Sequence, residues 1–91
     1  MESTEDSITV GWSKPRHDGG SPIQGYNVEK RVVGESQWSK ANHANIRDVT
    51  HRCINLIENE IYEFRAAAVN LAGQGPWSDP SENIKCISFR E

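Results

Sequence analysis

The sequence is short of apolar material. Of its 91 residues only 35% are hydrophobic, and the mean hydropathy is -0.71. A chain of this length buries only about 60–65% of its unfolded surface, so its three Trp, two Tyr and two Phe must supply much of the core. Little is left to enclose a large pocket, which argues against a self-contained enzyme. The charged share of 25% is that of a folded chain, and we interpret residues 1–91 as a single domain.

An excess of positive charge is also missing. The net charge is -3, and acidic residues outnumber basic ones in both halves, six to five in residues 1–45 and seven to five in residues 46–91. This balance argues against binding to nucleic acid and to anionic lipid. The longest apolar run, residues 66–69, is too short to cross a bilayer, and the acidic start Met1–Asp6 is unlike a signal peptide. We therefore expect no nucleic-acid and no membrane partner, and we interpret the sequence as a piece of a longer chain.

Cysteine and glycosylation signals are scarce. Cys53 and Cys86 allow one disulfide at most, and none of the seven Asn lies in an Asn-x-Ser/Thr sequon. Both features favour the cytoplasm over a secreted location.

What the sequence does contain is alternation of apolar and polar residues, which is typical of half-buried strands. We expect strands near 8–12, 23–33, around Trp38, and over 50–56, 61–70 and 84–89, with breaker-rich loops at 14–22 and 73–76. The alanines at 66–68 favour a helix locally, but the Tyr62-x-Phe64 alternation before them favours a strand. Six short strands without a convincing helix predict an all-β sandwich.

The order and spacing of particular residues are more specific than this alternation. They include Ser7–Trp12 with Pro15, Tyr26–Glu29, Leu56 six residues before Tyr62, Tyr62–Arg65 through Ala68 and Asn70, and Gly73-x-Gly75-x-x-Ser78. In these residues the chain resembles a fibronectin type III domain over nearly its whole length. Asp18–Ile23 followed by Tyr26–Arg31 resembles the modules of giant intracellular muscle proteins: titin, twitchin, myosin-binding protein C and myomesin.

The resemblance implies an immunoglobulin-like β-sandwich of two antiparallel sheets. Leu56 would close one end, and the Tyr62 hydroxyl would bond to upstream backbone as a tyrosine corner. Two departures stand out. Only five residues precede Asp6, so the first strand is truncated or missing, and Ala66 occupies a position where the family has a larger aliphatic residue. The second departure implies compensation by a neighbour or a softer core.

Chemical sites are hard to find. His51 and Cys53 share a strand face, and His17 and His43 lie in loops, but no zinc-ligand spacing is present. Gly73-x-Gly75 indicates a hairpin turn rather than a phosphate loop. We expect no catalytic, cofactor-binding or metal-binding residues and no cofactor, with Glu58 and Glu60 solvated on a corner. The resemblance places Cys53 and Cys86 in different sheets, which favours a reduced pair, although the sequence leaves a bridge open.

The alternation also predicts a charged outward face on two neighbouring strands. Glu29, Arg31, Glu63 and Arg65 point outward on neighbouring strands, where we favour cross-strand charge pairing over a binding site. Trp77–Ser81 resembles half of the Trp-Ser-x-Trp-Ser box of cytokine receptors, with Pro80 in place of the second Trp. We expect Arg65 to stack on Trp77 in a reduced version of that arrangement. This face and the end loops are where a partner is expected.

These features together predict a non-catalytic structural and interaction module, monomeric in isolation. The resemblance implies one link of a tandem array in a sarcomeric filament protein, in the cytoplasm and at the A-band. It also implies mechanical scaffolding and contacts with adjacent immunoglobulin-like or fibronectin domains and with thick-filament proteins such as myosin. The alternative is an extracellular adhesion or receptor module, since fold alone does not separate the two. A kinase domain elsewhere in the parent protein is compatible with both.

Overall fold

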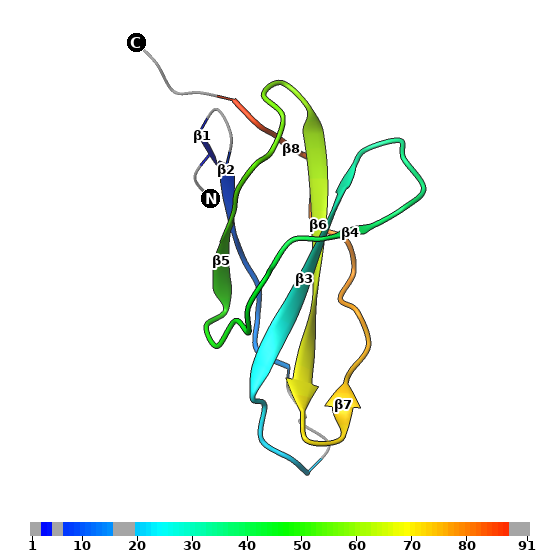
Figure 1. Cartoon of the computed structure of the whole chain (residues 1–91). Coiled ribbons are helices and arrows are strands. Elements are labelled where there is room, and N and C mark those ends of the chain that lie inside the picture. The colour runs from blue at the N-terminus through cyan, green and yellow to red at the C-terminus, as the bar shows by residue number, and fades with distance from the viewer. Residues whose placement is uncertain (1–2, 5–6, 16–19, 88–91) are drawn as a thin grey trace.

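The computed structural model describes residues 3–4, 7–15 and 20–87. The strands are β1 (Ser3–Thr4), β2 (Ser7–Gly11), β3 (Gly25–Val32), β4 (Ser39–Lys40), β5 (Thr50–Cys53), β6 (Ile61–Asn70), β7 (Gly73–Gln74) and β8 (Ile84–Lys85). They form two antiparallel sheets that face each other (Figure 1). Sheet A has the order β1-β2-β5, and sheet B has the order β4-β3-β6-β7 with β8 also paired to β6. The described part of the chain contains no helix, so the all-β sandwich is confirmed.

The core is built by the alternation seen in the sequence. β3 and β6 pair over their whole common length, with Tyr26 opposite Ala68 and Val32 opposite Tyr62. Successive side chains of a strand point to opposite faces, so one set from each strand is directed at sheet A. The buried cluster comprises Ile8, Val10, Tyr26, Val28, Ile46, Cys53, Leu56, Tyr62, Phe64, Ala66 and Cys86. Among the described residues, the aromatic members of this cluster are Tyr26, Tyr62 and Phe64, with Trp12 packed against it. Trp38 and Trp77 are partly buried against arginine side chains instead, so the expectation that the tryptophans supply much of the core was wrong.

The end of the sandwich between β5 and β6 is fixed by the two residues expected there. Leu56 is buried, and the Tyr62 hydroxyl accepts a hydrogen bond from the Ile57 N–H at 2.9 Å. The backbone of Cys86 then bonds to the same corner, through Asn59 N–H to Cys86 C=O and Cys86 N–H to Glu60 C=O. The tyrosine corner is therefore confirmed.

The first strand is truncated to the two residues of β1, which is one of the two outcomes expected for it. Several other predicted boundaries were wrong, and β5 ends at Cys53 rather than Leu56. Gly73 and Gln74 are a strand, not a turn, because the chain reverses at Leu71 and Ala72 and Gly73 takes a φ of 121°. The last strand is limited to Ile84–Lys85, and Phe89 lies outside the described residues.

The short β8 has a physical cause in the preceding segment. Residues 75–83 run along β6 without forming a regular strand, and prolines at 76 and 80 lack the N–H that a ladder needs. Contact with β6 instead recurs every third residue: Gly75 N–H bonds Ala68 C=O at 2.8 Å, and the Ser78 and Ser81 N–H groups bond the C=O groups of Ala66 and Phe64. Ile84 then pairs with Tyr62, so three residues of this segment match two residues of β6.

The serine hydroxyls complete this pairing. Ser78 Oγ accepts the Ala66 N–H, and Ser81 Oγ accepts the Phe64 N–H, both at 3.0 Å. Side-chain oxygens thus take the place of the strand carbonyls that are not in register. The half box at residues 77–81 thus binds β6 through Ser78 and Ser81, with Pro80 in place of the second Trp.

Ser81→Ala is expected to destabilise the domain by about 1 kcal/mol, because the partly buried Phe64 N–H loses its acceptor. Hydrogen exchange at the Phe64 amide should accelerate about fivefold relative to the wild type. Ser36→Ala, at an exposed position, serves as the control and should change neither quantity. Unchanged exchange at Phe64 would mean that the hydroxyl does not hold this amide.

Candidate functional site

The outward face of sheet B carries the charged residues singled out in the sequence. The strand register places Glu29 opposite Arg65 and Arg31 opposite Glu63. Arg65 donates to Glu29 Oε1 from Nε at 3.0 Å and from Nη2 at 2.6 Å, and Arg31 Nε donates to Glu63 Oε1 at 2.7 Å. All four side chains are partly buried. The predicted cross-strand pairing is confirmed.

Two tryptophans stack with the arginines. The Arg65 guanidinium lies 4.6 Å from the centre of the Trp77 ring, which confirms the expected contact. Trp38 was not foreseen as a member: its ring lies 4.3 Å from the Arg31 guanidinium and 4.4 Å from that of Arg65. We call the column Arg31, Trp38, Arg65 and Trp77 the stacked ladder. It links β3, β6 and the segments on either side of them.

The stacked ladder is built to hold strands together rather than to react. Each arginine already has a carboxylate and at least one ring, so neither presents an unpaired charge. An apolar pair continues the same face: Val33 N–H bonds Ile61 C=O at 2.8 Å, and both side chains are exposed. This face therefore combines exposed apolar side chains with charges that are paired internally.

Arg65→Ala should destabilise the domain by about 1–2 kcal/mol, because it removes two ring contacts worth roughly 0.5–1 kcal/mol each and leaves Glu29 unpaired. Urea unfolding measures this directly. Arg47→Ala is the matched control, since Arg47 is exposed and should change stability by less than about 0.5 kcal/mol. Equal effects of the two substitutions would refute the role of the ladder.

The other sequence candidates are scattered. His51 Nε2 lies 3.2 Å from the Ala41 carbonyl oxygen, and His43 is exposed on the segment before β5. Glu58 is exposed and Glu60 half-buried at the corner. Among the described residues no three His, Cys, Asp or Glu side chains are grouped as a metal site would require. His17 lies outside the described residues.

Cys53 and Cys86 are both buried, and no disulfide joins them in the structure. Cys53 sits in sheet A, and Cys86 directly follows β8 of sheet B. Burial raises the pKa of the Cys53 thiol to about 11, with a smaller opposing effect from the charge of Lys30. A thiol held protonated in this way is not a nucleophile at neutral pH.

Ala66, the residue that is smaller than the family's usual aliphatic at this position, lines an open groove. An open groove of about 780 Å³ runs between the sheets, with Ala66 and Ala68 in its floor and Trp12, Tyr26 and Trp77 among its walls. The Trp12 indole N–H is buried there without a hydrogen-bond partner in the described part of the chain. Ala66 is only 8% exposed, so it lies at the boundary between the core and this groove.

Comparison with known proteins decides the family. The model of the fibronectin type III domain matches residues 1–84, nearly the whole chain. The chain belongs to the fibronectin type III family. No helix in the described residues of this fibronectin type III domain could span a membrane.

The domain is similar to modules of muscle proteins. It is 46% identical to human myomesin-2 over 83 residues, which is 91% of this chain and 6% of that protein. It is 38% identical to mouse fast-type myosin-binding protein C over 81 residues, 89% of this chain and 7% of that one. Titin module A71 from human cardiac muscle superposes with a TM-score of 0.86 at 40% identity, covering 96% of this chain and 85% of the module. The fibronectin type III domain thus spans only a small part of the two full-length relatives.

Proposed function

We propose that this domain is a non-catalytic structural module of a tandem-domain sarcomeric filament protein, at the A-band of the cytoplasmic sarcomere. Its work is to hold spacing along the thick filament and to contact myosin and the adjacent immunoglobulin-like or fibronectin domains. The likeness to myomesin-2 over 91% of the chain carries the proposal. A face whose charges are already paired supports it, because such a face suits contact and load bearing rather than catalysis.

The proposed contact with myosin lies on the outward face of sheet B. Val33 and Ile61 are its exposed apolar residues beside the stacked ladder, and apolar side chains of this kind form the centre of protein interfaces. Contacts with neighbouring domains would use the ends of the sandwich, where the chain enters and leaves a module in a tandem array.

Co-sedimentation with purified myosin filaments tests the proposal. We expect the wild-type domain to pellet with the filaments and Val33→Asp to reduce the bound fraction at least fivefold. Val49→Asp is a matched control, because Val49 is 38% exposed against 39% for Val33 but precedes β5 in sheet A. Absence of wild-type binding, or equal loss in both variants, would count against myosin as the partner.

The thiols separate this proposal from an extracellular adhesion or receptor module. A sarcomeric domain should yield two titratable thiols per chain after unfolding without reductant, because both cysteines remain reduced in the cytoplasm. A Cys53–Cys86 disulfide in protein isolated from its source tissue would favour the extracellular alternative.

A further inference from the structure

The outer edge of β5 presents backbone groups that nothing in the described structure uses. Trp12 N–H bonds the carbonyl of Val49, the residue directly opposite it when the β2–β5 register is continued. Hydrogen-bonded pairs alternate along an antiparallel ladder, so His51 and Cys53 also bond to β2. Thr50 and Arg52 therefore direct their N–H and C=O groups away from β2, to the side where sheet A has no further strand.

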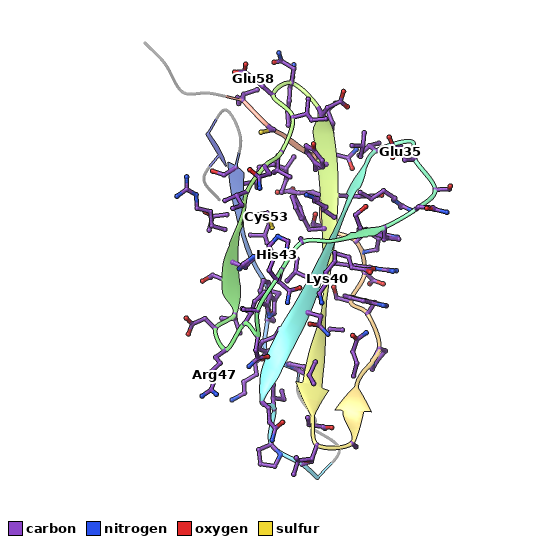
Figure 2. The ribbon with its side chains drawn as sticks, in the orientation of Figure 1. Glu35, Lys40, His43, Arg47, Cys53 and Glu58 are labelled. Atoms are coloured by element: carbon purple, nitrogen blue, oxygen red, sulfur yellow. The ribbon has the colours of Figure 1, made fainter. Side chains whose placement is uncertain are left out.

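A groove runs along this edge. It has a volume of about 430 Å³ and lies between β5 and the segment that crosses from sheet B, which includes Ala41, Ala44 and Ile46. Figure 1 shows that segment passing from β4 to β5, and Figure 2 shows Arg47 beside the end of β5 where the strand begins. Ala41, Ala44 and Ile46 thus supply an apolar part of the groove lining, and Thr50 and Arg52 with their free backbone groups line its other side.

The charges at this groove differ from those of the stacked ladder. Arg31 and Arg65 are each held by a glutamate, but Arg47 and Arg52 have no carboxylate partner in the described part of the chain. Within the described residues Arg52 donates to Ser7 Oγ alone, at 3.2 Å, and Arg47 is exposed. His43 and His51 line the same groove, together with one acid, Asp48. The edge is therefore a basic site on a chain whose net charge is -3.

We propose that the β5 edge is a docking site for an extended acidic segment of a partner protein, added to sheet A as a further strand. Four main-chain hydrogen bonds to Thr50 and Arg52 would hold the segment, as in other cases of strand addition. Because directly opposed residues share a face, its acidic side chains lie beside Arg52 on the outer face. Small apolar side chains at the alternate positions face the groove wall formed by Ala41, Ala44 and Ile46.

Charge selects this occupant over a second copy of the chain. Pairing of two β5 edges would bring Arg47 and Arg52 of one copy against the same unpaired arginines of the other, and like charges at close range oppose association. An acidic strand gains from both arginines. This docking site is separate from the outward face of sheet B, so the proposal does not depend on the proposed function.

A titration followed by amide NMR tests the site. The probe is the peptide Ac-Glu-Val-Glu-Val-Glu-Val-Glu-NH2, and the same peptide with Lys for Glu is the charge control. We expect the acidic peptide to shift the amides of Thr50 and Arg52 and slow their hydrogen exchange, with affinity falling at least fivefold when salt is raised from 50 to 500 mM. Equal binding of the Lys peptide, or shifts confined to sheet B, would overturn the proposal.

Variants separate backbone from charge. Thr50→Pro removes an N–H on the free side at the first residue of an edge strand, where proline is tolerated, and should weaken peptide binding at least fivefold. Thr50→Val keeps the N–H and should bind within twofold of the wild type. Arg47→Glu should weaken binding at least fivefold, and Lys14→Glu, the same change of charge at an exposed position away from the groove, should not. Unchanged affinity in Thr50→Pro, or concentration-dependent broadening at Thr50 without peptide, would refute an acidic strand as the occupant.

Discussion

Asn42→Ala should destabilise the domain by about 2–3 kcal/mol, although the residue lies in a polar connection. Asn42 is only 2% exposed, and its Oδ1 accepts the buried Val28 N–H at 2.9 Å. Its Nδ2 donates to Ala44 C=O at 3.0 Å. Alanine leaves the Val28 N–H buried without a partner, in the middle of the strand that carries the core. Thermal unfolding should shift downward by about 10–20 °C for a domain of this size.

Asn45→Ala is the matched control for this prediction. Asn45 is an asparagine of the same connection, but it is exposed, and its side chain makes one hydrogen bond among the described residues, from Nδ2 to Gln24 C=O at 3.1 Å. Its loss should cost no more than about 0.5–1 kcal/mol. If both variants unfold at the same urea concentration, the buried acceptor is not what holds β3 in place.

The second large effect is expected at alkaline pH and depends on Cys53. The thiol is 1% exposed, and burial holds its pKa at about 11 against 9.0 for the free side chain. Below pH 9 both states keep the proton and pH has no effect through this group. Between pH 9 and 11 the unfolded chain releases the proton while the folded chain retains it, so the free energy of unfolding falls. Two pH units correspond to about 2–3 kcal/mol.

Urea unfolding of the wild type and of Cys53→Ala at pH 7, 9, 10 and 11 measures this effect. Tyrosine and lysine titrations are common to both proteins, so the difference between the two curves isolates the thiol. The wild type should lose about 2–3 kcal/mol more than the variant over this range. Cys86→Ala is the control and should keep the decline that Cys53 causes. Parallel curves for the wild type and Cys53→Ala would contradict a buried protonated thiol.

Much of the fold could be predicted because alternation of apolar and polar residues along a strand shows which side chains point into the core and which point to solvent. Tyr62 and Phe64 point inward and Glu63 and Arg65 outward for as long as β6 is straight, so the strand and its charged face followed from spacing alone. The Arg65–Trp77 contact followed from the same parity together with the family resemblance. Long regular strands thus carried nearly all of the correct predictions.

The features that the sequence did not predict depend on where the irregular connections between strands bring the chain back onto the sheets. Trp38 enters the stacked ladder because the turn after β3 and the two-residue β4 place it over Arg31 and Arg65, and no periodicity specifies that return. Asn42 lies in a polar stretch of sequence, and only the assembled sheets show that its side chain is buried and accepts the Val28 N–H. A tryptophan close to a strand with outward arginines was the one available signal for the ladder. The unpaired β5 edge likewise becomes visible only once the strand order is known.

Residues 75–84 place three residues beside every two residues of β6, so this segment is longer when extended than the stretch of β6 that it covers. From Ala68 to Tyr62, β6 advances six residues, or about 20 Å at roughly 3.4 Å each. The nine residues from Gly75 to Ile84 could extend to about 30 Å if pulled straight. Detaching this segment from β6 therefore lengthens the molecule by about 10 Å while the β3–β6 ladder stays closed. Under a pulling force residues 75–84 would therefore detach from β6 first, in this short step, before the β3–β6 ladder opens.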